Sequence, residues 1–170
     1  MQPEPADQPG TLPTDSVLVR TLRAEDLEAV VAIDAAATGR RRPHYFELML
    51  QRAVKQAGLQ ISLVAEVDGR VVGFLIGSLY YGEFGLVEPT ASLDTIGVHP
   101  RHRGARVGKA LMRQLRLNLG ALHMRTLRTE VAWDDFELLA FFRSEGFALS
   151  GRLCLECPLD PTLPGDEGRV

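Results

Sequence analysis

The segment Leu93-Asp-Thr-Ile-Gly-Val-His-Pro-Arg-His-Arg-Gly-Ala-Arg-Val-Gly-Lys-Ala-Leu-Met112 decides the fold, because a turn rich in arginine and glycine joins an apolar stretch to an amphipathic one. The apolar stretch predicts a strand over residues 91–98, ended by Pro100. A helix is predicted over residues 105–119, since apolar side chains recur there at helical spacing: Val107, Leu111, Met112, Leu115 and Leu119.

The turn predicts a binding site for phosphate groups. The N–H groups in the first turn of a helix have no partner within the helix, and together with the helix dipole they attract anions. Gly104 lets the backbone approach a phosphate closely, and Gly108 permits close contact one turn later. Basic side chains are concentrated in this segment: Arg101, Arg103, Arg106, Lys109, Arg113 and Arg116. The alternative interpretation is a solvated basic face beside a chance pair of glycines.

The rest of the chain predicts alternating strands and helices of a single domain. The strands are expected at residues 17–23, 61–67, 71–81 and 126–132, with one or two closing strands within 147–158. Helices are expected from Glu25 to about Gly39, from Pro43 to Gly58, and over 135–144. Asp68-Gly69 predicts a tight hairpin. The domain would span 17–159, between a disordered tail at 1–16 and a flexible tail at 160–170.

Composition excludes several classes of function. The chain has 170 residues, is 45% hydrophobic and 24% charged, and carries a net charge of −3, which argues against general affinity for nucleic acid or anionic membrane. No apolar run is long enough to span a bilayer, and the first fifteen residues lack the basic start and apolar stretch of a signal peptide. We therefore expect a cytoplasmic protein. Cys154 and Cys157 lack further ligands nearby, so no metal site is predicted.

Two blocks of sequence resemble the GNAT acyl-CoA N-acyltransferases. Arg103-Gly-Ala-Arg-Val-Gly108, preceded by Ile-Gly-Val-His-Pro, is similar to the Q/R-x-x-G-x-G/A turn of this family. The block from Thr129 to Phe147 is similar to the family's strand, its following helix and its closing Gly-Phe. The resemblance covers residues 17–159 in element order. It implies an α/β GNAT-like fold, with a six- to seven-stranded mixed sheet, about four helices, and splayed parallel strands that form a CoA slot.

The resemblance also implies an activity, namely transfer of an acetyl group from acetyl-CoA to a primary amine by direct attack on the thioester. The acceptor would be a small molecule or the N-terminus of a protein or peptide, and a homodimer is compatible with the family. A backbone N–H on the strand, best assigned to Val98, would polarise the thioester carbonyl. Gly97 suits a bulge that would expose the backbone there. The cofactor-binding residues implied are Ile96, Gly97, Val98, Arg103, Gly104, Ala105, Arg106, Val107, Gly108, Lys109, Asp135 and Phe142.

Two carboxylates are candidates for the general base, directly or through water. Glu130 occupies the position of the catalytic glutamate in enzymes resembling the ribosomal-protein N-terminal acetyltransferases. Asp94 is expected on the strand face of Ile96 and Val98, pointing into the slot. The alternative for both is simple pairing with nearby Arg128 or Arg125.

Three positions depart from the family pattern. Arg106 stands where most members have glycine, and Asp135 replaces the helix asparagine that contacts the pantetheine arm. Phe142, preceded by Phe141, stands where many members have a tyrosine that protonates the leaving thiolate, and phenylalanine has no proton to donate. These departures leave a second hypothesis open: a catalytically impaired CoA-binding sensor or regulatory module.

Overall fold

The computed structural model describes residues 17–55, 57–81 and 88–157. The tails predicted at 1–16 and 160–170 lie outside these residues. Within them the strands are β1 (Leu18–Thr21), β2 (Leu63–Val67), β3 (Arg70–Tyr80), β4 (Thr90–Val98) and β5 (Thr126–Arg128). The α-helices are α1 (Leu27–Thr38), α2 (Pro43–Lys55), α3 (Val107–Ala121) and α4 (Phe136–Ser144).

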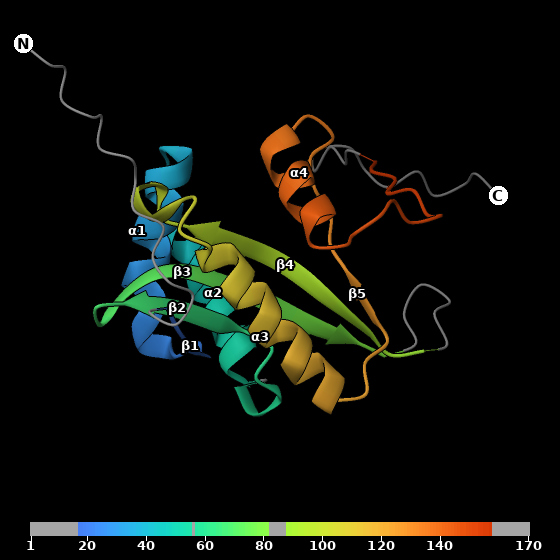
Figure 1. Ribbon diagram of the computed structural model, residues 1–170, viewed down its shortest axis with the longest axis horizontal. Coiled ribbons are helices and arrows are strands. Elements are labelled where there is room, and N and C mark those ends of the chain that lie inside the picture. The colour runs from blue at the N-terminus through green and yellow to red at the C-terminus, as the bar shows by residue number, and fades with distance from the viewer. Residues whose placement is uncertain (1–16, 56, 82–87, 158–170) are drawn as a thin grey trace, which may run out of the picture.

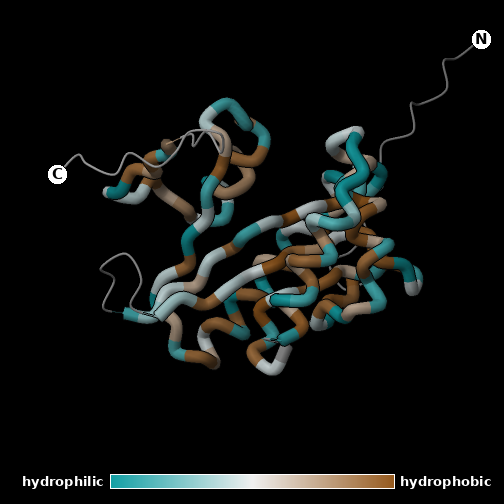
Figure 2. The backbone as a smooth tube through the Cα atoms, turned by 180° about the vertical axis from the view of Figure 1, so that it is seen from behind, coloured by the Kyte–Doolittle hydropathy of each residue, from teal (hydrophilic) through white to brown (hydrophobic). Residues whose placement is uncertain are grey.

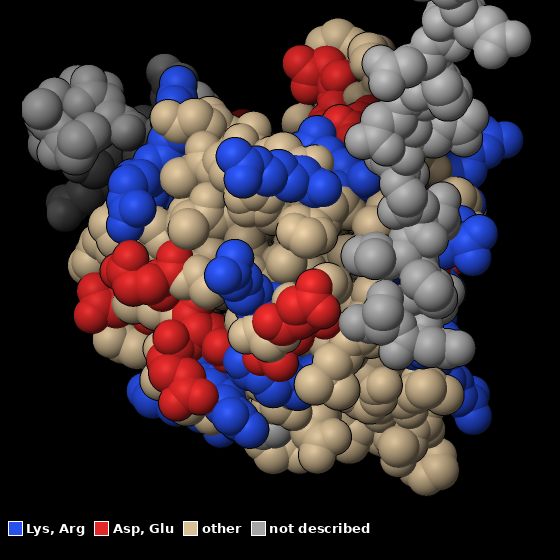
Figure 3. Space-filling model, turned by 60° about the vertical axis from the view of Figure 1, so that its left-hand side comes forward, with Lys and Arg blue, Asp and Glu red and all other residues tan. Residues whose placement is uncertain are grey.

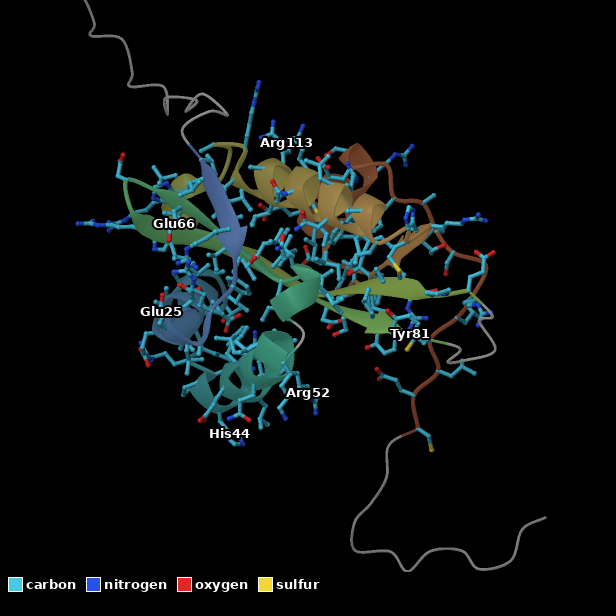
Figure 4. All side chains as sticks on the ribbon, turned by 90° about the horizontal axis from the view of Figure 1, so that it is seen from below. Glu25, His44, Arg52, Glu66, Tyr81 and Arg113 are labelled. Atoms are coloured by element: carbon cyan, nitrogen blue, oxygen red, sulfur yellow. The ribbon has the colours of Figure 1, made fainter. Side chains whose placement is uncertain are left out.

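The described strands form one mixed sheet in the order β1-β2-β3-β4-β5. The first four strands pair antiparallel, whereas β4 and β5 are parallel and are connected through α3. Helix α3 covers one face of this sheet, and α1 and α2 cover part of the other (Figure 1). In Figure 4, Arg113 of α3 and Arg52 of α2 lie on opposite sides of the sheet. The order of elements matches the prediction up to α4.

The core consists of two clusters, one on each side of the sheet. The cluster under α3 includes the five apolar residues predicted for its inner face, all buried: Val107, Leu111, Met112, Leu115 and Leu119. The second cluster joins α1 and α2 to the opposite face of the sheet through Val30, Phe46 and Phe74. Figure 2 shows most of the hydrophobic tube within the sheet and these helices.

Local signals in the sequence explain the hairpin and the end of α1. Asp68 and Gly69 have φ angles of 51° and 72°, so both turn residues adopt the left-handed conformation that a two-residue hairpin requires. Gly39 ends α1 with φ 72°, and its N–H donates to Ala35 O at 2.8 Å. Both predictions are confirmed.

A buried ion-pair network ties β1, β2 and the start of α1 together. Arg20 donates to Asp26 through both terminal nitrogens, at 2.8 and 2.7 Å, and to Glu66 through Nε at 2.7 Å. Burial opposes ionisation of Asp26, but these bonds and the N–H of Arg23 outweigh it and hold the pKa of Asp26 below its usual range. On the face shown in Figure 3, acidic and basic side chains likewise lie next to one another.

The sheet has fewer strands than the six to seven predicted. The described residues form five, β5 covers three residues instead of 126–132, and residues 147–157 contain no strand. Ser150 Oγ accepts the N–H of Arg152 at 3.4 Å, a local bond that competes with strand pairing. Leu149, Leu153 and Leu155 are exposed in this segment. Because β5 offers so short an edge, the predicted closing strands have little to pair with.

Candidate functional site

The turn between β4 and α3 is fixed by short-range bonds. His99 Nδ1 accepts the N–H of Arg101 at 3.2 Å, and Pro100 begins a 3-10 helix, η5 (Pro100–His102). Gly104 follows with φ 79°, a conformation that side chains rarely adopt. The N–H of Ala105 then donates to His102 O at 3.3 Å. These contacts set the direction in which the chain enters α3.

Arg106 adopts a left-handed backbone conformation, which glycine reaches more easily than other residues. Its φ and ψ are 61° and 14°, in the left-handed region, at the N-cap of α3. For a residue with a Cβ this conformation costs roughly 1–2 kcal/mol. The restriction on φ expected from the sequence is therefore overcome, and the path of the turn does not require glycine here.

The first turn of α3 presents backbone donors next to basic side chains. The N–H of Ala110 donates to Arg106 O at 3.0 Å, which begins the helical ladder, so the N–H groups of residues 107–109 precede it. Arg106, Lys109 and Arg113 line a hollow along the helix together with Ala110. Donors and cations together fit a ligand that carries phosphate groups.

Two other basic residues of this segment, Arg103 and Arg116, form ion pairs with acidic residues at the two ends of α4. Arg103 Nη1 lies 3.2 Å from a carboxylate oxygen of Glu137, at the start of α4. Arg116 Nη1 lies 3.1 Å from a carboxylate oxygen of Glu145, just after α4. Arg103 was predicted to bind the cofactor, and the structure gives it this second role in placing α4.

Strands β4 and β5 separate after a short stretch of pairing. They pair over three residues, Thr90 to Ser92 against Thr126 to Arg128. Thr129 Oγ1 then donates to Leu93 O at 2.9 Å, and a side chain thus takes the place of the next backbone bond. Beyond this point the strands diverge, β4 towards α3 and β5 towards α4 (Figure 1). This is the splayed parallel pair that the sequence predicted.

The backbone of β4 presents a donor towards the diverging side. The N–H of His99 donates to Val72 O of β3 at 2.8 Å. Successive N–H groups along a strand point to opposite sides, so the N–H of Val98 points away from β3. The N–H of Ile96 points the same way as that of Val98, and the side chains of both residues pack against the cluster under α3.

Gly97 lies in regular pairing with Phe74, so the bulge predicted at this glycine is wrong. A Cβ at Gly97 would stand 2.6 Å from Cε1 of the Phe74 ring. The glycine is required because this buried ring packs directly on the strand backbone.

The bulge in β4 is at Asp94 instead. Ile76 lies opposite Thr95 and Gly77 opposite Leu93, so no residue of β3 faces Asp94. The extra residue changes the alternation, and Asp94 is exposed on the face where Ser78 Oγ donates to its Oδ2. The expectation that Asp94 shares the face of Ile96 and Val98 is therefore wrong.

Asp94 and Glu130 flank the point of separation. Asp94 directly follows Leu93 and Glu130 directly follows Thr129, the two residues joined by the last bond between the strands. Glu130 is exposed, with Cys154 Sγ 4.0 Å from its Oε2. The arginines proposed as structural partners have other contacts: Arg125 lies 3.8 Å from Glu88, and the Arg128 guanidinium lies 5.0 Å from the centre of the Tyr80 ring.

The remaining predicted positions lie on α4. Asp135 caps this helix, because its Oδ1 accepts the N–H of Leu138 at 3.0 Å. Phe142 is only 4% exposed and stacks on Phe147 within the core, so it offers little surface to a ligand. The half-buried Phe141 instead approaches the first turn of α3, where a Cβ at Gly108 would lie 3.2 Å from its ring.

Sequence reasoning missed Ser78 and left Tyr80 unplaced. Ser78 and Tyr80 stand two residues apart on β3, opposite Ser92 and Thr90. Tyr81, at the end of β3 in Figure 4, is exposed. Polar residues at alternating positions of β3 and β4 indicate a polar face of the sheet. Which residue of β3 lies beside Asp94 depends on the register between the two strands.

The basic run at 40–44 is occupied by contacts with α1. Arg42 donates to Asp34 through Nε at 3.0 Å and Nη2 at 2.6 Å, and these bonds raise the pKa of Arg42. Arg41 lies 3.2 Å from Glu28. These pairs fix the α1–α2 loop.

Neither a cluster of metal ligands nor a helix fit to span a membrane is found among residues 17–55, 57–81 and 88–157. No three His, Cys, Asp or Glu side chains in these residues gather as metal ligands would, and Cys154 and Cys157 are exposed and not in a disulfide. Among the described helices, none is both long and apolar enough to cross a membrane.

Three solved structures of similar fold bear on this site. Ard1 from Thermoplasma volcanium is 25% identical, with a TM-score of 0.65 over 79% of this chain and 84% of that chain. The ribosomal-protein-alanine N-acetyltransferase from Brucella melitensis biovar Abortus 2308 is 22% identical, with a TM-score of 0.65 over 84% and 99%. The aminoglycoside N-acetyltransferase AAC(6′)-Iy, solved in complex with CoA, is 17% identical, with a TM-score of 0.66 over 84% and 94%.

The sequence profile of the Acetyltransferase (GNAT) family matches residues 27–147, a span that begins at α1 and ends just after α4. It includes the turn before α3, the diverging strands and both candidate carboxylates. The chain belongs to the GNAT acetyltransferase family.

Proposed function

We propose that this enzyme transfers an acetyl group from acetyl-CoA to a primary amine by direct attack of the amine on the thioester. The observation that carries the proposal is the separation of β4 from β5 beside Asp94, with the N–H of Val98 on the diverging side. A hydrogen-bond donor and a proton acceptor are thus available at one opening, as acyl transfer requires.

The residues of the turn fit the phosphorylated end of CoA. The N–H groups of residues 107–109 and the side chains of Arg106, Lys109 and Arg113 would bind its phosphates. Residues 96–98 would bind the pantetheine arm between the strands, with Phe141 near the first turn of α3. Bound acetyl-CoA supplies the thioester whose acetyl group is transferred.

Asp94 is the better candidate for the general base, and Glu130 is the second. Both carboxylates are exposed beside the opening, but Asp94 is oriented by a hydrogen bond from Ser78. In this proposal Asp94 accepts a proton from the acceptor amine, directly or through water, while the N–H of Val98 donates to the carbonyl under attack.

Protonation of the leaving sulfur does not require a tyrosine in this proposal. Phe142 occupies that position in sequence and is buried in the core. A free thiol has a pKa of about 8.5, so CoA can leave as thiolate and take its proton from water.

The acceptor is proposed to be a small molecule or a peptide N-terminus, because proteins with this fold act on both kinds. Cys154 and Cys157 are exposed and not in a disulfide, which fits a reducing compartment, so we expect the enzyme in the cytoplasm. Size-exclusion chromatography with light scattering would test for the homodimer.

The test is release of CoA thiol from acetyl-CoA with a panel of N-terminal peptides, aminoglycosides and simple amines. We expect Asp94→Asn to lower kcat by about 10²- to 10⁴-fold while acetyl-CoA still binds. Asp68→Asn, which alters an exposed carboxylate in the β2–β3 turn, is the matched control. Binding of acetyl-CoA without turnover of any acceptor would refute the proposal and favour the sensor hypothesis.

A further inference from the structure

Ser78 and Asp94 form a side-chain pair that the predicted site did not include. Ser78 belongs to β3 and Asp94 to β4, and Ser78 Oγ donates a hydrogen bond to Oδ2 of Asp94. The pair lies on the face of the sheet opposite α3, since the neighbouring residue Leu79 packs into the cluster under that helix. The hydroxyl occupies one oxygen of the carboxylate that we propose as the base.

The bulge separates Asp94 from the face of Ile96 and Val98. In a regular ladder every residue of β4 would have a partner on β3, and its side chain would alternate between the two faces. Leu93 packs into the cluster under α3, so plain alternation already places Asp94 on the face of Ser92 and Ser78. The extra residue leaves Asp94 without a partner on β3 and turns Ile96 and Val98 to the face of α3. Bulges commonly redirect a side chain beside an active site.

Gly77 and Ser62 hold in place the segment of β3 that lies opposite the bulge. A Cβ at Gly77 would lie 3.0 Å from the carbonyl oxygens of both Ile61 and Ser92, so no side chain fits there. Ser62 Oγ accepts the N–H of Gly77 at 3.2 Å and is itself buried, with 4% of its surface exposed. The backbone that carries Ser78 is therefore held by a buried hydroxyl two strands away from Asp94.

An exposed aspartate that lacked such support would sample several orientations. Rotation about χ2 of Asp is broad, so a solvated carboxylate on a strand has no single direction. A bond from a fixed neighbour selects one orientation, and the alignment of a base with its substrate strongly affects rate.

We propose that Ser78 is a positioning residue for Asp94. Its hydroxyl holds Oδ2, and Oδ1 then accepts the proton of the acceptor amine. The inference rests on the proposed function and deepens it, because it assigns the base to the β3–β4 bulge rather than to Glu130.

The experiment compares Ser78→Ala, Ser78→Thr, Asp94→Asn and the double variant Ser78→Ala/Asp94→Asn, using the best acceptor from the amine panel. We expect Ser78→Ala to lower kcat about tenfold, with the KM for acetyl-CoA changed less than about twofold. Ser78→Thr keeps the hydroxyl and restores kcat to within about threefold of wild type. The double variant is no slower than Asp94→Asn alone, because the hydroxyl acts only through Asp94.

Ser92→Ala is the matched control, since it removes a hydroxyl directly opposite Ser78 on β4 and should leave kcat unchanged. Thermal unfolding shows whether each variant still folds. If Ser78→Ala does not fold, the kcat of Ser78→Thr decides the role of the hydroxyl. If Asp94→Asn is slow but Ser78→Ala equals wild type, the role of Ser78 alone is refuted. If Asp94→Asn stays active, the roles proposed for Asp94 and for Ser78 are both refuted. If the wild type turns over no acceptor, the proposed function and this inference are refuted together.

Discussion

Thr129 Oγ1 donates to Leu93 O at 2.9 Å, and this bond is the last between β4 and β5 before they separate. A side chain thus ends the parallel ladder that the backbone began. Since Asp94 and Glu130 directly follow the two bonded residues, the bond also brings both to the point where the strands separate.

Replacement of Thr129 by valine keeps the branched side chain and removes the donor. We expect a loss of about 1 kcal/mol in the free energy of unfolding, the net contribution of one hydrogen bond, measured by urea denaturation. Thr126→Val changes an exposed threonine of the same strand and should stay within about 0.5 kcal/mol of wild type. Equal losses in the two variants would show that the bond to Leu93 has no special weight.

The left-handed conformation of Arg106 separates a backbone effect from a charge effect. Arg106→Ala removes the guanidinium and keeps the strain of a Cβ, whereas Arg106→Gly removes both. Arg106→Gly should therefore be more stable than Arg106→Ala by about 1 kcal/mol. Both should bind acetyl-CoA about three- to tenfold more weakly than wild type, as expected for loss of a charge-assisted contact to phosphate.

Isothermal titration with acetyl-CoA measures the affinities of the Arg106 variants, and thermal unfolding measures their stability. Arg70→Ala, on an exposed arginine of the β2–β3 hairpin, is the control for total charge and should bind like wild type. Affinity in Arg106→Gly that exceeds wild type by orders of magnitude would mean that the side chain obstructs the cofactor.

Substitution of Gly97 tests the packing of the Phe74 ring against the backbone of β4. In Gly97→Ala the new Cβ lies 2.6 Å from Cε1 of Phe74, whose ring is buried against Phe46. We expect a loss of about 1–3 kcal/mol in the free energy of unfolding from overpacking. Adding Phe74→Leu to Gly97→Ala should recover part of the lost stability. The losses of the two single variants should therefore sum to more than the loss of the double variant.

Gly120→Ala is the control for this prediction, because nothing lies within 4 Å of a Cβ at that helical position. It should be neutral or stabilising by about 0.5–1 kcal/mol. A Gly97→Ala protein as stable as wild type would mean that Phe74 moves freely, and that the glycine serves another purpose.

Much of the fold could be predicted from local sequence signals. The hairpin at Asp68-Gly69, the end of α1 at Gly39 and the inner face of α3 each depend on a turn residue or a helical period, and all are confirmed. The strand, turn and helix around Gly104 were predicted for the same reason, since they are adjacent in the chain; anion binding by this turn stays a prediction.

The bulge at Asp94 could not be predicted in this way. It depends on the register between β3 and β4 and on the bond from Ser62 to Gly77, residues that are distant in sequence from Asp94. The bulge was predicted at Gly97, but that glycine is required by the packed ring of Phe74 and not by a bulge. Phe141 and Phe142 were similarly confused, because the helical period alone does not say which of two adjacent aromatic residues enters the core.

Asp26 is expected to make stability depend on acid pH. Its pKa is lowered in the folded protein, since the bonds from Arg20 and the N–H of Arg23 outweigh the effect of burial. Such a group stabilises the fold above its unfolded pKa of about 3.9, and the contribution is lost as pH falls through the lower folded value. Unfolding free energy should thus decline below about pH 4 in part because Asp26 takes up a proton.

Asp26→Asn removes this titration together with the ion pair. At pH 7 we expect it to be less stable than wild type by about 1.5–3 kcal/mol, the range for a hydrogen bond to a charged group. The difference between the two proteins should shrink as the pH approaches 2, because wild-type Asp26 is then protonated as well. Urea denaturation at pH 7, 5, 4, 3 and about 2 measures this, with Asp68→Asn as a control that stays parallel to wild type. A gap between Asp26→Asn and wild type that stays constant with pH would show that Arg20 leaves the titration of Asp26 unchanged on folding.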